Sequence, residues 1–189
     1  NTGEKVLNRS LRIGQKTFVE DNPKVALTLR NLGVLYRRQG LYGKAEQYYM
    51  RSLVIYEKVL GKNHPRVAMS MNGLGIIYME QGNYSKAEQY YKHSLEIREK
   101  VLGAEHPEVV NTLSNLGLLY TKIGLYGKAE SIFMRSLSIL EKIHGAEHPE
   151  VANSLMNLAN LKDKIGQKYS AGMLHNRSLK IREKVFGLE

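Results

Sequence analysis

Apolar residues recur every three or four positions along almost the whole chain, and this spacing predicts amphipathic helices. The first complete helix is expected to begin at Pro23, because proline is favoured in the first turn of a helix. Its packed positions are Val25, Leu29, Leu32 and Tyr36. Gly40 is expected to end this helix, since glycine adopts the left-handed cap conformation at little steric cost.

A second helix is expected from about Tyr42 to Leu60, and Gly61 is expected to end it. Its packed side carries Ala45, Tyr49, Ser52, Tyr56 and Val59. No segment of strand length alternates between apolar and polar residues with a period of two, so the pattern predicts an all-α chain.

This two-helix pattern repeats, because Pro65 follows Pro23 after 42 residues and the other two prolines, Pro107 and Pro149, keep that interval. Four more rows have the same period: Gly40, Gly82, Gly124 and Gly166; Gly61, Gly103, Gly145 and Gly187; Ala45, Ala87, Ala129 and Ala171; and a Ser-Leu pair at Ser52, Ser94, Ser136 and Ser178. Five rows in register predict a stacked array of helix pairs.

The array is expected to contain four helix pairs preceded by a lone second helix at about residues 4–18, which makes about nine antiparallel helices. We divide the chain into residues 1–22, the second helix of a truncated repeat; 23–64, 65–106 and 107–148, three complete units; and 149–189, a divergent unit. Together they are expected to form one solenoid domain.

Glycines in the middle of the first helices would each cost about 1 kcal/mol relative to alanine. They are Gly33, Gly75 and Gly117. We expect them where the backbone of a neighbouring helix must come close.

The residues inside each unit resemble the tetratricopeptide repeat, which has a large apolar residue, Leu-Gly, Tyr, Ala and an aromatic residue at fixed offsets. The three complete matches are Leu29, Leu32-Gly33, Tyr36, Ala45 and Tyr49; Met71, Leu74-Gly75, Tyr78, Ala87 and Tyr91; and Leu113, Leu116-Gly117, Tyr120, Ala129 and Phe133. The 42-residue unit, its His-Pro start and the ending from Ile97 to Gly103 are similar to kinesin light chains and nephrocystin-like proteins. The resemblance implies an all-α, right-handed superhelix of tetratricopeptide type.

The fourth unit departs from this pattern at Ala159, Lys162, Lys168 and His175, where the other units have glycine, tyrosine, tyrosine and an aromatic residue. It is either a polar end cap or a degenerate internal unit. We favour an array that continues in a longer parent protein, and whether Leu188-Glu189 is native stays open.

Composition and charge reduce the number of possible functional classes. The chain of 189 residues is 42% hydrophobic and 24% charged, which is ordinary for a globular protein and too apolar for a disordered one. It has no cysteine, so disulfides and thiolate metal sites are excluded. The formal net charge of +10 favours acidic partners such as nucleic acid, an anionic membrane or acidic peptides.

Catalytic and metal-binding patterns are not found. His64, His106 and His148 lie one repeat apart, whereas one metal ion needs its ligand atoms within about 2.0–2.1 Å, so we expect them to have a structural role at the helix starts. We find no zinc pattern around His93, His144 and His175, and no phosphate-binding loop. The sequence therefore predicts a protein that is not an enzyme and has no cofactor or metal.

The side of each first helix opposite its packed stripe lines the concave groove in tetratricopeptide arrays, and the resemblance implies the same here. We predict a peptide-binding groove formed by Arg30, Asn31, Val34, Arg37, Arg38, Asn72, Ile76, Met79, Ser114, Asn115, Leu118, Lys122, Asn157 and Lys164. Similarity to kinesin light chains implies that Asn31, Asn115 and Asn157 bind the ligand backbone, since amides both donate and accept hydrogen bonds. Gly73 interrupts this asparagine row.

The basic residues of the groove favour acidic ligands, and its apolar residues favour an apolar or aromatic anchor. We therefore expect a cytoplasmic, non-enzymatic scaffold that binds short, acidic, extended peptides of a partner, as in cargo recognition by kinesin light chains, or a segment of its own parent protein. A membrane partner is not expected.

Two alternatives remain open. One is a self-assembly module with an unoccupied groove, and the other is nonspecific binding of nucleic acid. The second alternative would use a basic ladder, Arg9, Arg51, His93, Arg135 and Arg177, although these side chains would also serve to cover apolar surface between helices.

Overall fold

The structure is a computed structural model that describes residues 3, 5–7, 9 and 21–187. Eight complete helices lie in this part of the chain: α2 (Pro23–Arg38), α3 (Tyr42–Leu60), α4 (Pro65–Glu80), α5 (Tyr84–Leu102), α6 (Pro107–Lys122), α7 (Tyr126–His144), α8 (Pro149–Lys164) and α9 (Lys168–Phe186). The described residues contain no strand, which confirms the all-α prediction. The lone helix expected at residues 4–18 falls largely outside the described residues.

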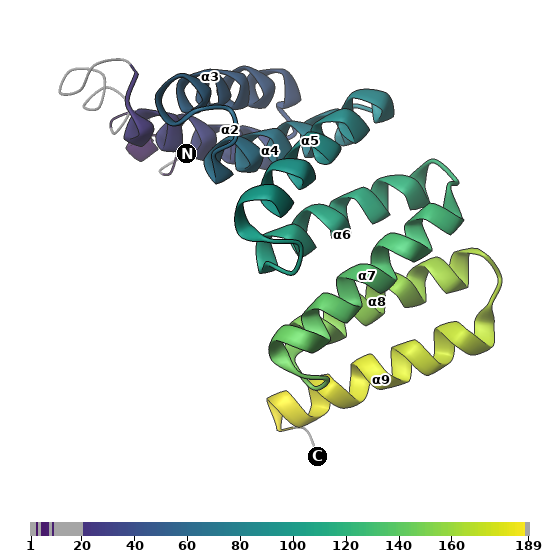
Figure 1. Cartoon of the computed structure of the whole chain (residues 1–189). Helices are drawn as coiled ribbons and strands as arrows, with labels where there is room; N and C mark the ends of the chain where they lie inside the picture. The colour runs from purple at the N-terminus through teal and green to yellow at the C-terminus, as the bar shows by residue number, and fades with distance from the viewer. Residues whose placement is uncertain (1–2, 4, 8, 10–20, 188–189) are drawn as a thin grey trace. The chain divides into compact units, whose positions relative to one another are not determined.

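The chain divides into two compact units, Asn1–Leu102 with α2 to α5 and Gly103–Glu189 with α6 to α9. Within each unit, consecutive helices pack against one another as hairpins (Figure 1). The right-handed winding and the single solenoid domain depend on how the units are placed, and they stay predictions.

Side chains before the prolines begin the first helices. The Oδ1 atom of Asn22 accepts a hydrogen bond of 2.8 Å from the backbone N–H of Lys24. The Nδ1 atoms of His64, His106 and His148 accept from the N–H two residues later at 3.1 to 3.2 Å. These bonds satisfy a backbone donor that lacks a partner within the helix. The structural role predicted for the three histidines is thus confirmed.

An aromatic ring from each second helix fills a notch at a first-helix glycine. A Cβ atom added at Gly75 would lie 2.5 Å from Cε1 of Tyr91, and one added at Gly117 would lie 2.5 Å from Cε1 of Phe133. Both rings are buried. The sequence prediction was therefore wrong in one detail, because these glycines admit an aromatic ring and not a neighbouring backbone.

The ring of Tyr49 occupies two such notches, because Cβ atoms at Gly33 of α2 and at Gly73 of α4 would both overlap it. Tyr49 is 3% exposed. The glycine that interrupts the asparagine row is thus required by packing within the first unit.

The packed side of α3 ends earlier than the sequence predicts. Ala45, Tyr49, Ser52 and Tyr56 are buried, but Val59 is 41% exposed. Val59 lies in the last turn of α3. No helix in the described part of the chain has the length and apolarity required to cross a membrane.

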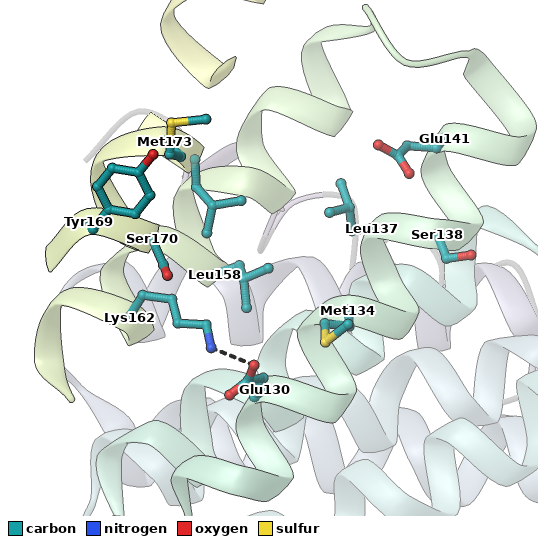
Figure 2. Close-up of a pocket in the computed structure, with 11 residues that line it drawn as sticks. Glu130, Met134, Leu137, Ser138, Glu141, Leu158, Lys162, Tyr169, Ser170 and Met173 are labelled. Carbon is teal, nitrogen blue, oxygen red and sulfur yellow. Dashed lines mark hydrogen bonds and ion pairs between the residues drawn. The ribbon is translucent and has the colours of Figure 1, made fainter. Parts of the chain in front are cut away.

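Polar contacts replace aromatic ones in the fourth unit. Lys162 stands where the second repeat, residues 65–106, has Tyr78. Tyr78 donates its hydroxyl to Oε1 of Glu46 at 2.7 Å, and Lys162 Nζ makes the equivalent contact with Oε1 of Glu130 at 2.5 Å (Figure 2). Lys162 therefore makes the same contact to a glutamate as Tyr78 but has no aromatic ring.

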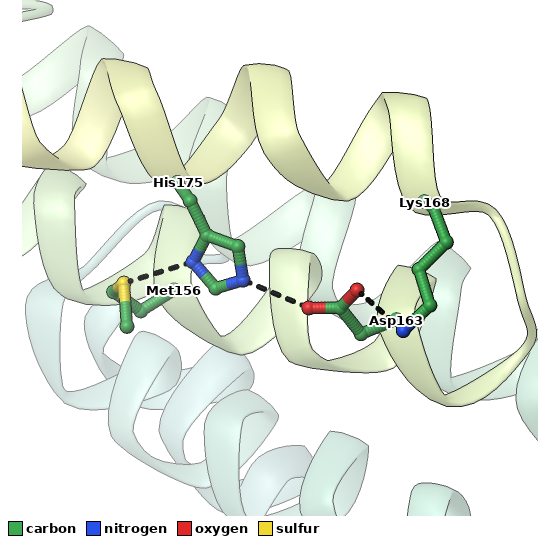
Figure 3. A network of polar contacts seen from close by, with 4 residues as sticks. All are labelled: Met156, Asp163, Lys168 and His175. Carbon is green, nitrogen blue, oxygen red and sulfur yellow. Dashed lines mark hydrogen bonds and ion pairs between the residues drawn. The ribbon is translucent and has the colours of Figure 1, made fainter.

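His175 takes the place of the notch-filling ring on α9. Its Nε2 lies 3.0 Å from Oδ2 of Asp163, and its Nδ1 lies 3.4 Å from Sδ of Met156, both on α8 (Figure 3). Lys168 Nζ reaches the other oxygen of Asp163 at 3.3 Å. The hydrogen bond from His175 is the main cause that holds the pKa of the Asp163 carboxyl below its usual value, and Lys168 adds to it.

We predict that Gly75→Ala destabilises the protein by about 1–3 kcal/mol, because the new methyl group overlaps the buried ring of Tyr91. The gain in helix propensity, about 1 kcal/mol, offsets only part of this. Urea unfolding followed by circular dichroism measures the change. The matched control is Gly43→Ala in the first turn of α3, where an added Cβ meets nothing within 4 Å. Equal stability of the two variants would show that the Tyr91 notch is not tightly packed.

A second prediction concerns acid stability. Since the folded-state pKa of Asp163 is lowered, its contribution is complete above the unfolded-state pKa of about 3.9 and is lost as the pH falls through the lower folded-state value. Asp163→Asn should therefore be less stable than the parent protein at pH 7, and the two should converge in strong acid. Urea midpoints across the pH range test this, with Glu96→Gln, an exposed glutamate, as control. A difference that does not depend on pH would contradict the prediction.

Candidate functional site

The predicted groove residues of the first unit lie on α2 and α4. None of them is buried: Arg38 is exposed, and Arg30, Asn31, Val34, Arg37, Asn72, Ile76 and Met79 are partly exposed. We call this set the first-helix face of unit 1. It is a surface that a ligand can reach, and it is not part of the packed core.

The guanidinium group of Arg30 is only partly hydrogen-bonded within the described residues. Its Nη1 donates to Oδ1 of the adjacent Asn31 at 3.3 Å. Its Nε is buried and has no hydrogen-bond acceptor among the described residues. A buried donor without an acceptor is costly.

One carboxylate balances part of the positive charge. Glu80 Oε1 lies 3.7 Å from Nη1 of Arg37, which links α4 to α2. The other oxygen of Glu80 accepts a hydrogen bond of 2.9 Å from the hydroxyl of Tyr42, and this bond is the main cause that raises the pKa of Tyr42. With Arg30, Arg37 and Arg38 against Glu80, the first-helix face of unit 1 keeps an excess of positive charge.

The remaining predicted groove residues lie on α6 and α8 of the second unit. Ser114, Asn115 and Asn157 are partly exposed, whereas Leu118, Lys122 and Lys164 are exposed. Lys164 Nζ lies 3.4 Å from the backbone oxygen of Thr121, which ties α8 to α6. Because these residues and those of α2 and α4 belong to different units, a continuous groove through both sets stays a prediction.

Two cavities of the second unit lie near the predicted binding residues or on the opposite side of the helix pairs. A cavity of about 180 Å³ in the second unit includes Ser114, together with Pro107 and Asn111. A larger cavity, of about 520 Å³, lies on the other side of the helix pairs, between α7 and α9 and over α8 (Figure 2). Sequence reasoning missed it, although the departures of the fourth unit from the repeat were its signal.

The structure also contains a cluster of two histidines and a glutamate that the sequence did not predict. His144, at the end of α7, stacks on His148 with a ring-centroid distance of 4.2 Å, and its Nε2 lies 3.4 Å from Oε2 of Glu150. The ligand atoms of the three residues lie within 4.8 Å of one another. His144 and His148 meet across the loop between α7 and α8 and do not have the spacing of a helical zinc motif.

The cap geometry argues against metal binding by this cluster. His148 Nδ1 accepts the N–H of Glu150, so in the neutral ring the proton must sit on Nε2. A metal ion at Nε2 would require loss of that proton or of the cap. We therefore assign His148 to helix capping.

The basic ladder has a structural explanation in the last unit. Arg177 Nη2 lies 2.6 Å from Oε1 of Glu141 and 3.4 Å from the backbone oxygen of Ala146. An arginine held by a carboxylate and a carbonyl is already engaged within the fold. This favours the packing interpretation of the ladder at Arg177 over one in which it binds phosphates.

Comparisons with known structures agree with this repeat architecture. The crystal structure of BtubC (BKLC) from P. vanneervenii is 24% identical, with 98% of this chain and 74% of that chain covered and a TM-score of 0.86. Two crystal structures of the Podosopora anserina putative kinesin light chain nearly identical TPR-like repeats are 24% identical, with 96% and 86% covered and TM-scores of 0.80 and 0.77. At this level of identity, the likeness shows the fold.

A comparison with curated proteins found no match. The family model for the tetratricopeptide repeat, in contrast, matches residues 1–58, 34–100, 68–142 and 108–184. Tetratricopeptide repeats generally mediate protein–protein interaction, and their fold is generally a non-enzymatic scaffold. Since these matches extend over nearly the whole sequence, the chain belongs to the tetratricopeptide repeat family.

Proposed function

We propose that the protein is an interaction scaffold whose first-helix faces bind an acidic, extended peptide. The observation that carries the proposal is the arginine group of α2, in which Arg30, Arg37 and Arg38 lie close to Asn31 and three positive charges face the one carboxylate of Glu80, which pairs with Arg37. Carboxylates suit such a surface, because a guanidinium group binds them through two parallel hydrogen bonds.

The asparagines and apolar residues extend this proposal. Asn31 on α2, and Asn115 and Asn157 on α6 and α8, would bind the peptide backbone, which offers one donor and one acceptor per residue. Val34, Ile76 and Met79 are partly exposed and would hold an apolar or aromatic anchor of the ligand. On the second unit, the proposed binding face would include Ser114, Leu118, Lys122 and Lys164.

The peptide would come from a partner protein or from another segment of the same parent protein. The likeness to kinesin-light-chain-like repeats supports a role in cargo recognition in the cytoplasm, with the peptide supplied by a cargo adaptor. Nothing in this scheme requires a cofactor or a metal.

We predict that Arg30→Gln/Arg37→Gln weakens binding of an acidic peptide about tenfold or more, because hydrogen bonds between charged groups contribute roughly 1.5–3 kcal/mol each. The probe is a fluorescent twelve-residue peptide that contains glutamates and one phenylalanine, measured by anisotropy. Its counterpart with glutamine for glutamate should bind weakly to every variant. Affinity for the acidic peptide should also fall as salt rises.

The charge-matched control is Arg51→Gln/Lys62→Gln, which removes the same charge from exposed positions on α3 and in the following loop. It should bind like the parent protein. Equal loss in both double variants would mean that net charge alone attracts the peptide, and unchanged affinity in Arg30→Gln/Arg37→Gln would refute the proposal. Light scattering without peptide identifies self-assembly as the alternative.

Removal of the balancing carboxylate should have the opposite effect. Glu80→Gln abolishes the ion pair with Arg37 and leaves that guanidinium group available, so the acidic peptide should bind several-fold more tightly. Anisotropy at low salt measures this gain. Weaker binding by Glu80→Gln would instead show that Glu80 holds Arg37 in the binding conformation.

A further inference from the structure

The second unit contains a cavity on its second-helix side that the proposed peptide-binding faces do not use. It has a volume of about 520 Å³ and lies between α7 and α9, with Leu158 and Lys162 of α8 at its base (Figure 2). Its apolar lining consists of Met134, Leu137, Leu158, Tyr169, Met173 and Leu174. We call it the α7–α9 pocket.

The first unit shows what fills the equivalent place between α3 and α5. Two repeats before Lys162 and Leu174 stand Tyr78 and Tyr90. Their rings stack with centroids 5.4 Å apart and planes 15° apart. The hydroxyl of Tyr90 contacts Sδ of Met50 at 3.7 Å. In the first unit, therefore, two phenol rings of the chain itself occupy this position.

The second unit keeps the surroundings of those rings but not the rings. Met134 and Glu130 occupy the repeat positions of Met50 and Glu46, which the two tyrosine hydroxyls contact in the first unit. A lysine and a leucine replace the tyrosines, and neither can fill the place of two stacked rings. The pocket thus has the surroundings of the Tyr78–Tyr90 pair without the two rings.

The rim of the pocket is also more apolar than the equivalent surface of the first unit. Tyr169 is 83% exposed and Met173 is 59% exposed, and they stand where the first unit has the polar residues Ser85 and Gln89. Met134 is 55% exposed. Methionine side chains adapt to irregular surfaces and make favourable contacts with aromatic rings. Exposed apolar side chains around a cavity are typical of an interaction site.

The acidic residues of the pocket are already paired, so the ligand must be neutral. Glu130 is bound to Lys162, and Glu141 is bound to Arg177. A charged ligand would lose hydration without finding an uncompensated partner charge. A phenol ring meets these conditions, because its body is apolar and its hydroxyl can donate to the sulfur of Met134 or to a carboxylate oxygen of Glu130.

We propose that the α7–α9 pocket is a second docking site, which binds the side chain of a tyrosine in a partner polypeptide. The ring would take the place that Tyr90 fills in the first unit, between Met134 and Met173. Tyr169 would stack on the ligand from the rim. The site is separate from the arginine face of α2, so it remains valid if the acidic-peptide proposal fails.

Methyl NMR tests this directly, since the chain has only seven methionines. Protein labelled with ¹³C at the methionine methyl groups is titrated with the tripeptide N-acetyl-Gly-Tyr-Gly-amide and with p-cresol. The methyl signals of Met134 and Met173 should shift with saturation, because a bound ring changes their local field. Met50, which already contacts Tyr90, is the internal control and should not move. The control peptide N-acetyl-Gly-Leu-Gly-amide should not shift the methyl signals of Met134 and Met173.

The decisive variant restores the missing rings. Lys162→Tyr/Leu174→Tyr should fill the pocket and weaken tyrosine binding about tenfold or more, since the new rings occupy the space that the ligand ring would fill. Its control is Leu179→Tyr, which adds a ring on exposed surface of the same helix outside the pocket. If the double variant does not fold, Met173→Glu replaces it as the test. This variant should also weaken tyrosine binding, because it places a charge at the apolar rim of the pocket.

Several results would overturn the proposal. Absence of shifts at Met134 and Met173, or equal shifts at Met50, would show that no such site exists. Shifts with p-cresol but not with the tyrosine tripeptide would mean a pocket for small phenols. Concentration-dependent broadening of the ligand-free protein that disappears in Tyr169→Ala would mean that a second copy of the chain occupies the pocket.

Discussion

The architecture depends on one contact, in which an aromatic ring on a second helix enters a notch that a glycine leaves on a first helix. Tyr91 against Gly75 and Phe133 against Gly117 show it in the two units, and both rings are buried. A ring held in a notch cannot slide along or rotate around the neighbouring helix, because any Cβ there would overlap it. This fixes the rotation of each first helix, and the same rotation turns its polar side away from the core.

The notch also limits what the binding face can contain. Gly73 lies where the repeat has Asn31, Asn115 and Asn157, yet a side chain at this position would overlap the ring of Tyr49. Packing therefore requires glycine at a position that belongs to the proposed ligand-binding row. In the proposed binding face, the first unit would rely instead on the arginines of α2, of which Arg30 contacts Asn31 and Arg37 contacts Glu80.

Features set by local rules were predictable from the sequence. The first helix of each repeat begins at His-Pro or Asn-Pro, and glycines follow the helix ends, because capping and φ preferences act over a few residues. The bounds of α3 agree with the expected Tyr42–Leu60. Contacts between side chains distant in the sequence were not predictable in this way. The stack of His144 on His148 crosses a loop, and the exposure of Val59 follows from the packing of whole helices. The candidate face was found from helical periodicity, whereas its pairing with Glu80 required coordinates.

The fourth unit shows how a repeat can change its surface and keep its fold. Lys162 preserves the contact to a glutamate, and His175 preserves a side chain between α8 and α9, held by Asp163. Polar anchors thus replace aromatic ones where the helices meet, and the lost ring volume reappears as the cavity beside α7. A polar end cap would be expected to expose charged side chains, yet α9 exposes Tyr169 and Met173. Apolar side chains at the rim of a cavity are stabilised only when another group covers them, so the surface of α9 favours a helix that contacts a further polypeptide over one that faces only water.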